Sequence, residues 1–266
     1  MNVHTEHDAR AALPPAAFGR LAEVALAPGA LAIADLHLDA ARADSVARFT
    51  GFLAAIRGAP ALLVLGDLFD VWVGPAEERL PGARLVLEAL AAFARDGASV
   101  HVVPGNRDFL LDAGFERASG ARLHPEGFVA LAGGARVLCV HGDTLCTRDA
   151  GYLRLRRVLR SAPVRALGPR LPLWLSSAIA RRMRRASVSV IAKKLPDEKS
   201  LQRAAAELLA RHHSASTVLC GHAHAFRDEP LASGARWIVL DAFGGARDVA
   251  CFGAEGIGGF RASGGG

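Results

Sequence analysis

The stretch ALLVLGDLFD, Ala61 to Asp70, runs from five apolar residues straight into a glycine and a polar cluster. A short apolar run bounded in this way is typical of a strand that is buried on both faces. Asp67 and Asp70 would then lie just beyond the carboxyl end of that strand. Because ligands of layered α/β proteins bind at the carboxyl ends of the strands, this stretch predicts both a fold class and the place of a site.

The same change from apolar to polar residues recurs along the chain. It occurs in ALAIADLH, SVHVVPGNRD, ARVLCVHGD, STVLCGHAH and RWIVLDAF, which are residues 30–37, 99–108, 135–143, 216–224 and 236–243. Helical periodicity separates some of these runs, over residues 45–56 and 84–95. The alternation of strands and helices predicts a layered α/β domain whose polar clusters meet at one edge of the sheet.

Composition limits the class of protein. With 266 residues, 51% of them hydrophobic, and a mean hydropathy of +0.23, the chain can bury a large core without a disulfide or a structural metal. Its four cysteines have no CxxC spacing, which favours a reducing compartment. The first residues, MNVHTEHDARAALPP, lack the pattern of a signal peptide, and no apolar run approaches the ~20 residues that span a bilayer. We therefore expect a cytoplasmic protein.

The net charge of +6 is distributed unevenly. Residues 148–211 hold 16 basic and 4 acidic side chains, a charge of +12, so the rest of the chain carries −6. Within this segment, Leu175, Ile179 and Met183 recur at helical spacing beside several arginines. Such a helix can cover an acyl chain or lie on an anionic membrane surface, although an ordinary helix packed on the core would show the same apolar stripe.

The polar clusters supply carboxylate, amide and imidazole donors. Nitrogen and oxygen donors of this kind suit Mn, Fe, Zn or Co better than Ca, and no cysteine pair is spaced for a zinc finger. Asp35 and His37 lie two residues apart at a strand end and should point the same way, as should His222 and His224. Asp67 has two oxygens that can bridge two cations, which would favour hydrolysis at phosphorus. The candidate ligands are Asp35, His37, Asp67, Asn106, His141, His222 and His224.

The ordered blocks DLH, GDLFD, GNRD, HGD and GHAH, between Asp35 and His224, resemble those of the calcineurin-like metallophosphoesterases. The resemblance implies a β-sandwich flanked by helices and two divalent cations, with manganese as the expected metal. It also implies two ligand sets that share Asp67. One set adds Asp35, His37 and His224, and the other adds Asn106, His141 and His222.

Arg107 stands where many members of this family have a histidine. A histidine there can protonate an alkoxide leaving group, whereas arginine, with a pKa above ~12, cannot donate a proton. Arg107 can only stabilise negative charge on the phosphate oxygens of a substrate, which suits the cleavage of a phosphoanhydride. The simpler alternative is that Arg107 only pairs with its neighbour Asp108.

GNRDFL and HGDTLCTRDAGYLRLRRVLR are similar to stretches of the UDP-2,3-diacylglucosamine hydrolases. That family splits the pyrophosphate of a diacylated UDP-sugar into UMP and a lipid monosaccharide 1-phosphate during lipid A synthesis, on the cytoplasmic face of the inner membrane. The resemblance implies substrate contacts at Arg107, Asp149, Ser187 and Lys194, while Asn106 and His222 would contact both metal and substrate. Asn106, Arg107 and His222 would then be the catalytic residues.

The chain departs from the pattern of these hydrolases at several places. GHAHAFRDEP lacks the usual Arg-Pro, and Ile191 replaces a polar residue. Another nucleotide-sugar, a dinucleotide or a phosphodiester therefore remains an alternative substrate. The expected organisation is an N-terminal extension at 1–29, a metallophosphoesterase domain at 30–258 with a helical cap insertion at about 151–212, and a disordered glycine-rich tail at 259–266.

A nucleic-acid binding protein is the main alternative of another class, because the sequence pI is 9.8. Only 6% of the residues are aromatic, and the basic segment offers no stacking side chains beyond Tyr152 and Trp174. We therefore expect no nucleic-acid partner. A purely structural role would require the seven candidate ligands to be coincidental.

Overall fold

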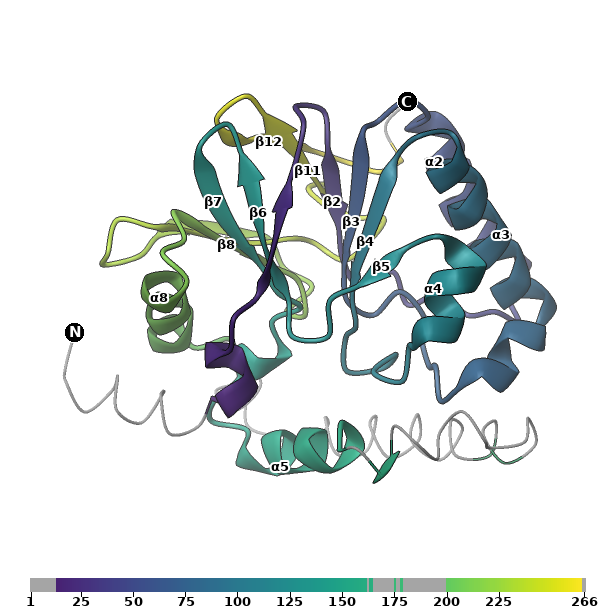
Figure 1. Cartoon of the computed structure of the whole chain (residues 1–266), viewed down its shortest axis with the longest axis horizontal. Coiled ribbons are helices and arrows are strands. Elements are labelled where there is room, and N and C mark those ends of the chain that lie inside the picture. The colour runs from purple at the N-terminus through teal and green to yellow at the C-terminus, as the bar shows by residue number, and fades with distance from the viewer. Residues whose placement is uncertain (1–12, 162, 165–174, 176–177, 179–199, 265–266) are drawn as a thin grey trace.

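The computed structural model describes residues 13–161, 163–164, 175, 178 and 200–264. Two six-stranded sheets lie face to face, with helices on their outer faces (Figure 1). This arrangement confirms the expected layered α/β fold. Among the described helices, none combines the length and the apolar character that crossing a membrane would require.

The first sheet has the order β1-β6-β7-β8-β10-β9. Its strands are β1 (Ala22–Ala25), β6 (Phe128–Ala132), β7 (Ala135–Cys139), β8 (Thr217–Cys220), β10 (Arg236–Val239) and β9 (Arg227–Pro230). The second sheet has the order β12-β11-β2-β3-β4-β5. Its strands are β12 (Gly256–Arg261), β11 (Val249–Gly253), β2 (Leu31–Ile33), β3 (Ala61–Leu65), β4 (Ser99–Val103) and β5 (Arg122–Leu123).

Helices cover the outer faces of both sheets and one end of the sandwich. The α-helices are α2 (Ala43–Ala55), α3 (Pro81–Arg95), α4 (Ala113–Ser119), α5 (Ala150–Leu159) and α8 (Arg203–His212). The 3₁₀ helices are η1 (Pro15–Phe18), η2 (Pro75–Arg79) and η3 (Asp143–Leu145). In Figure 1, α2, α3 and α4 flank the second sheet, α8 flanks the first, and α5 lies across one end of both.

Burial explains the sequence patterns of these elements. All five residues of β3 are buried, because the strand has a sheet on one side and helices on the other. That is why its sequence is continuously apolar and does not alternate. In α3 the buried residues Ala83, Val86, Leu87 and Leu90 recur at the spacing of one helix face.

The central strands end just before the polar clusters. In the second sheet, the parallel strands β2, β3 and β4 end at Ile33, Leu65 and Val103. In the first sheet, the parallel strands β7 and β8 end at Cys139 and Cys220. The loops that follow them therefore emerge at the end of the sandwich where α5 lies (Figure 1).

The structure adds regular elements to three of the expected segments. The segment assigned to an N-terminal extension contains β1, which pairs in parallel with β6 as an edge strand of the sheet. Gly259 to Arg261, expected to be disordered, belong to β12, because pairing with β11 and the ring contact of Phe260 with Phe226 outweigh the flexibility of glycine. Helix α8, placed in the cap, packs on the first sheet and is part of the layered domain.

The remainder of the expected cap is described only in part. Ile179, Met183, Ser187, Ile191 and Lys194, on which the membrane helix and two substrate contacts depended, lie outside the described residues.

Candidate metal centre

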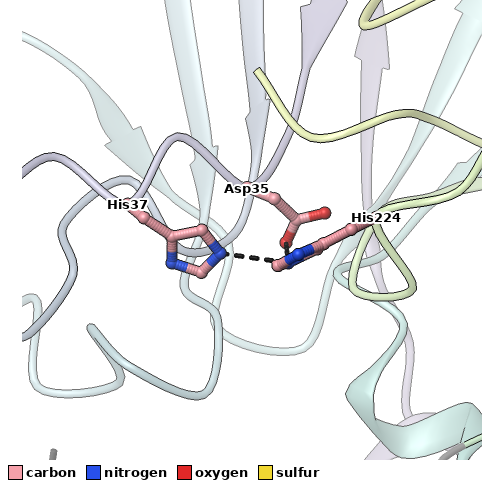
Figure 2. A group of neighbouring side chains, drawn as sticks. All are labelled: Asp35, His37 and His224. Carbon is pink, nitrogen blue, oxygen red and sulfur yellow. Dashed lines mark hydrogen bonds and ion pairs between the residues drawn. The ribbon is translucent and has the colours of Figure 1, made fainter. Parts of the chain in front are cut away.

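Asp35, His37 and His224 form the first group of candidate ligands (Figure 2). Asp35 and His37 lie in the loop after β2, and His224 lies in the loop after β8. The Nε2 atoms of the two histidines are 3.0 Å apart, and His224 Nε2 is 3.7 Å from Asp35 Oδ1. Asp35 Oδ1 and His37 Nδ1 are buried without a hydrogen-bond partner among the described residues. Buried polar atoms without partners are costly, so these donors fit a cation.

Asp67 and His141 form a second group with the same Asp35. His141 Nε2 lies 3.9 Å from Asp67 Oδ1, 3.0 Å from Asn106 Oδ1 and 3.2 Å from His222 Nδ1. His141 Nδ1 is 2.9 Å from the Leu65 carbonyl oxygen, and only a protonated Nδ1 can donate to it. In the neutral imidazole, the lone pair of Nε2 then faces the other donors, as a metal ligand requires.

The electrostatics of the centre also fit divalent cations. Burial raises the pKa of Asp35 to about 7 and raises that of Asp67 as well, while it lowers the pKa of His37 and of His222 to about 3. His37 and His222 are thus neutral, which is the form that binds metals, and the carboxylates lie where positive charge stabilises their ionised form. Burial of His141 lowers its pKa, but the charges of Asp67 and Asp35 outweigh burial and raise it.

Left-handed backbone conformations orient the ligands. The φ angles are 52° at Asp35, 47° at His37, 50° at Asp67, 73° at His222 and 53° at His224. Ser214 is the one other described non-glycine residue with a positive φ. We expected the side chains of DxH and HxH to converge because residues two apart on a strand point the same way. That explanation is wrong, because both motifs lie past the strand ends. Such outliers are uncommon and gather at functional sites, which supports a site here.

Three glycines allow the loops to approach the ligands closely. A Cβ atom at Gly66 would lie 2.1 Å from His141 Nδ1, one at Gly105 would lie 2.1 Å from Asp67 Oδ1, and one at Gly221 would lie 2.6 Å from Asp35 Oδ2. No side chain fits at those distances. The glycines of GD, GN and GH in the sequence motifs therefore have a steric role in assembling the centre.

Arg107 lies against the centre and is paired with a carboxylate that the sequence analysis did not assign. Its Nη1 donates to Asp70 Oδ1 across 2.6 Å, its Nε is 3.7 Å from Asp67 Oδ2, and its backbone N–H donates to Asp67 Oδ1 across 2.9 Å. The alternative in which Arg107 only pairs with Asp108 is wrong. The position of Asp70 in GDLFD, three residues after Asp67, was the available signal.

Asp108 instead joins two loops of the centre. Its side chain is completely buried and accepts hydrogen bonds from the backbone N–H groups of Leu68, Phe69 and Gly105. The GDLFD and GNRD loops are therefore held together by one carboxylate. Because its partners are backbone groups, no motif of side chains in the sequence indicates this role.

Helix α5 begins beside the centre and is attached to it by charged side chains. Asp149 caps the helix by accepting from the backbone N–H of Tyr152. Buried Asp143, two residues after His141, accepts from the Tyr152 hydroxyl and from Arg156 Nε. Arg160 Nη2 donates to the carbonyl oxygen of Pro104, next to the GNRD turn.

The sequence comparisons with known proteins agree on one family. Residues 30–226 match the family model of the calcineurin-like phosphoesterases. A UDP-2,3-diacylglucosamine hydrolase from Aeromonas salmonicida is 40% identical over 214 residues, which cover 79% of this chain and 84% of the relative. Its counterpart from Pseudomonas aeruginosa is 36% identical over 215 residues, which cover 79% of this chain and 89% of the relative. Among solved structures, a dimetal phosphatase from Danio rerio is 16% identical with a TM-score of 0.42, covering 81% of this chain and 88% of that one.

Proposed function

This chain belongs to the calcineurin-like phosphoesterases, and on that basis we propose that it hydrolyses the pyrophosphate bond of UDP-2,3-diacylglucosamine. The products would be UMP and 2,3-diacylglucosamine 1-phosphate, in the biosynthesis of lipid A. The observation that carries the proposal is the placement of Arg107 beside Asp67, in a chain whose relatives, up to 40% identical, are named for this substrate. A fixed positive charge that cannot donate a proton suits an anhydride, whose leaving phosphate needs none.

Two divalent cations fit the donors, and we propose manganese. The first would be held by Asp35, His37, His224 and Asp67, and the second by Asn106, His141, His222 and Asp67. When bound, such cations act as Lewis acids at phosphorus and lower the pKa of a water molecule that attacks it.

The remaining groups bind and orient the substrate. Arg107, held at one end by Asp70, offers its guanidinium to phosphate oxygens beside Asp67. Asn106 and His222 would contact both the second cation and the substrate. We also propose that Asp149, Ser187 and Lys194 contact the substrate.

We further propose that the basic segment binds the cytoplasmic face of the inner membrane. Its charge of +12 over residues 148–211 supports this location, since the substrate is a lipid. Sedimentation with vesicles tests it. Binding to anionic vesicles should weaken as salt rises, because screening acts over ~10 Å at 0.1 M salt. Equal binding to neutral and anionic vesicles at every salt concentration would contradict the electrostatic attraction.

Mass spectrometry of the products tests the reaction itself. Purified protein with manganese should release UMP from UDP-2,3-diacylglucosamine, and Asp67→Ala should lose most bound metal and nearly all turnover while remaining folded. Asp96→Ala, at an exposed carboxylate outside the centre, is the matched control. Full activity of Asp67→Ala would contradict the two-metal proposal. If the protein hydrolyses only another nucleotide-sugar, a dinucleotide or a phosphodiester, that compound is the substrate in place of UDP-2,3-diacylglucosamine.

A further inference from the structure

A cavity of about 300 Å³ opens beside the first group of candidate ligands, between the loop after β2 and the start of α2. His37 lies in its wall on the side of the centre, and so does Asp70, the partner of Arg107. A ligand in this cavity would therefore contact one candidate metal ligand and the carboxylate that holds the proposed phosphate-binding arginine. Farther from the centre, its lining includes Asp39, Ser45, Arg48 and Phe243.

Arg48 gives the cavity a positive charge that is available to a ligand. Its guanidinium passes close to Gly244, where a Cβ atom would lie 3.4 Å from Nη1. Within the described part of the chain, no carboxylate pairs with Arg48, whereas its neighbour Arg42 is paired with Asp44 across 2.7 Å. An exposed arginine at the edge of a cavity can donate to carbonyl or phosphate oxygens of a bound molecule.

Phe243 gives the same cavity a flat apolar wall. Its ring is half-buried and is held by edge contacts with Phe49 and Phe52, at centroid distances of 6.3 Å and 5.3 Å. Its backbone N–H donates to the carbonyl oxygen of Asp35 across 3.4 Å. The position of the ring is thus tied to the loop of a candidate metal ligand, and a planar base can stack on such a ring.

We infer that this cavity binds the nucleoside monophosphate half of the substrate, with its base between Phe243 and Arg48 and its phosphate toward His37. This inference rests on the proposed function, because it divides that substrate into two halves. Acyl chains need apolar walls, whereas most of the lining of this cavity is charged or polar. The lipid half is therefore excluded from it, and Asp39 and Ser45 offer hydrogen bonds to ribose hydroxyls.

Binding of UMP and of ribose 5-phosphate to the full-length, manganese-loaded protein tests the inference by isothermal titration calorimetry. The two ligands share the sugar and the phosphate, so a difference between them reports on the base. Arg48→Ala and Phe243→Leu should each weaken UMP binding about tenfold, as expected for the loss of one charged hydrogen bond or one stacking contact. Neither should change the affinity for ribose 5-phosphate more than about twofold.

Arg57→Ala is the matched control, because Arg57 is exposed, lies just after α2 and pairs only across the surface with Asp96. UMP binding that is no tighter than that of ribose 5-phosphate, or equally weakened by Arg57→Ala, would overturn the inference. These outcomes are separate from turnover. If the protein binds UMP through Arg48 but does not hydrolyse UDP-2,3-diacylglucosamine, the nucleotide site is supported and the proposed substrate is wrong. Turnover of UDP-2,3-diacylglucosamine without base-dependent binding of UMP would support the proposed substrate and overturn the nucleotide site.

Discussion

Gly105 shows how a single residue controls the assembly of the candidate metal centre. A Cβ atom at this position would lie 2.1 Å from Asp67 Oδ1 and 2.4 Å from the Asp67 backbone nitrogen. Gly105→Ala should therefore displace Asp67, so that bound metal per chain and kcat both fall by about tenfold or more, the range of losses seen when support of metal ligands is removed. Metal analysis after dialysis measures the first effect, and turnover measures the second.

Gly51→Ala is the control for this steric effect, because Gly51 lies on an exposed turn of α2 with no atom near its missing Cβ. That substitution should leave metal content unchanged and stabilise the helix by roughly 0.5–1 kcal/mol. Normal metal content in Gly105→Ala would show that the approach of the two loops is not required for binding.

Arg107 makes the sharpest chemical prediction at the scale of one residue. If its guanidinium stabilises charge on a pyrophosphate and donates no proton, Arg107→Lys should retain some activity, while Arg107→His and Arg107→Ala should not. The loss in Arg107→Ala should appear mainly in kcat, on the order of 10²–10³-fold. Rates on a UDP-sugar and on an alkyl phosphodiester of similar size measure the preference for the anhydride. Faster cleavage of the alkyl ester, or a His variant that outperforms the natural protein on the UDP-sugar, would contradict this role.

At the scale of one element, α5 is attached to the domain by a buried network of charges. Arg156 is only 7% exposed and donates to Asp143 across 3.0 Å and to Glu126 across 2.9 Å. Burial raises the pKa of Asp143, but the guanidinium groups of Arg156 and Arg160 outweigh burial and lower it. Asp143 is therefore ionised, and its buried negative charge depends on the positive charge of Arg156 for compensation.

Arg156→Met should destabilise the protein by roughly 3–5 kcal/mol, because it leaves a buried carboxylate without its partner. Adding Asp143→Asn should restore part of that loss, since the uncompensated charge is then removed. Chemical denaturation followed by circular dichroism measures both variants. Arg157→Met is the control, because Arg157 is exposed on the same helix and its replacement should change stability by less than about 0.5 kcal/mol. An equal effect of the two single substitutions would disprove the special role of the network.

At the scale of the whole molecule, a pair of buried histidines lies where the chain passes from one sheet to the other. His101 on β4 and His124 after β5 are joined by a hydrogen bond of 3.0 Å, and both rings pack on Phe128 of β6. Burial lowers the pKa of His124 from its ordinary 6.5 to about 4, and it also lowers that of His101, with Arg122 nearby. The contact between the sheets thus contains two imidazoles that are neutral in the folded state.

This pair predicts a loss of stability in acid. Between about pH 6.5 and pH 4 the unfolded His124 binds a proton that the folded one does not, so stability is complete above about 6.5 and falls as the pH drops toward 4. His124→Gln should therefore lose less stability than the natural protein between pH 7 and pH 5, as measured by thermal unfolding of both manganese-loaded proteins. An identical fall in melting temperature in the two proteins would contradict the contribution of the pair.

The sequence by itself determined the central strands, the helices α2 and α3, and the residues of the candidate centre, because apolar periodicity and the short motifs are local patterns. Among the strands it left out, β1 and β9 are short edge strands with polar residues, and β12 is rich in glycine. Their existence depends on pairing with a partner strand rather than on their own residues.

Only the tertiary structure decided how the centre is assembled. His37 and His224 are 187 positions apart in the chain, yet their Nε2 atoms lie 3.0 Å from each other. Left-handed turns orient them, and the partner of Arg107 proved to be Asp70 rather than the adjacent Asp108. The cavity beside Arg48 likewise combines residues of α2 with Phe243, which follows β10. These features are contacts between distant segments, and their geometry arises only when the two sheets pack together and bring the loops to one end of the sandwich.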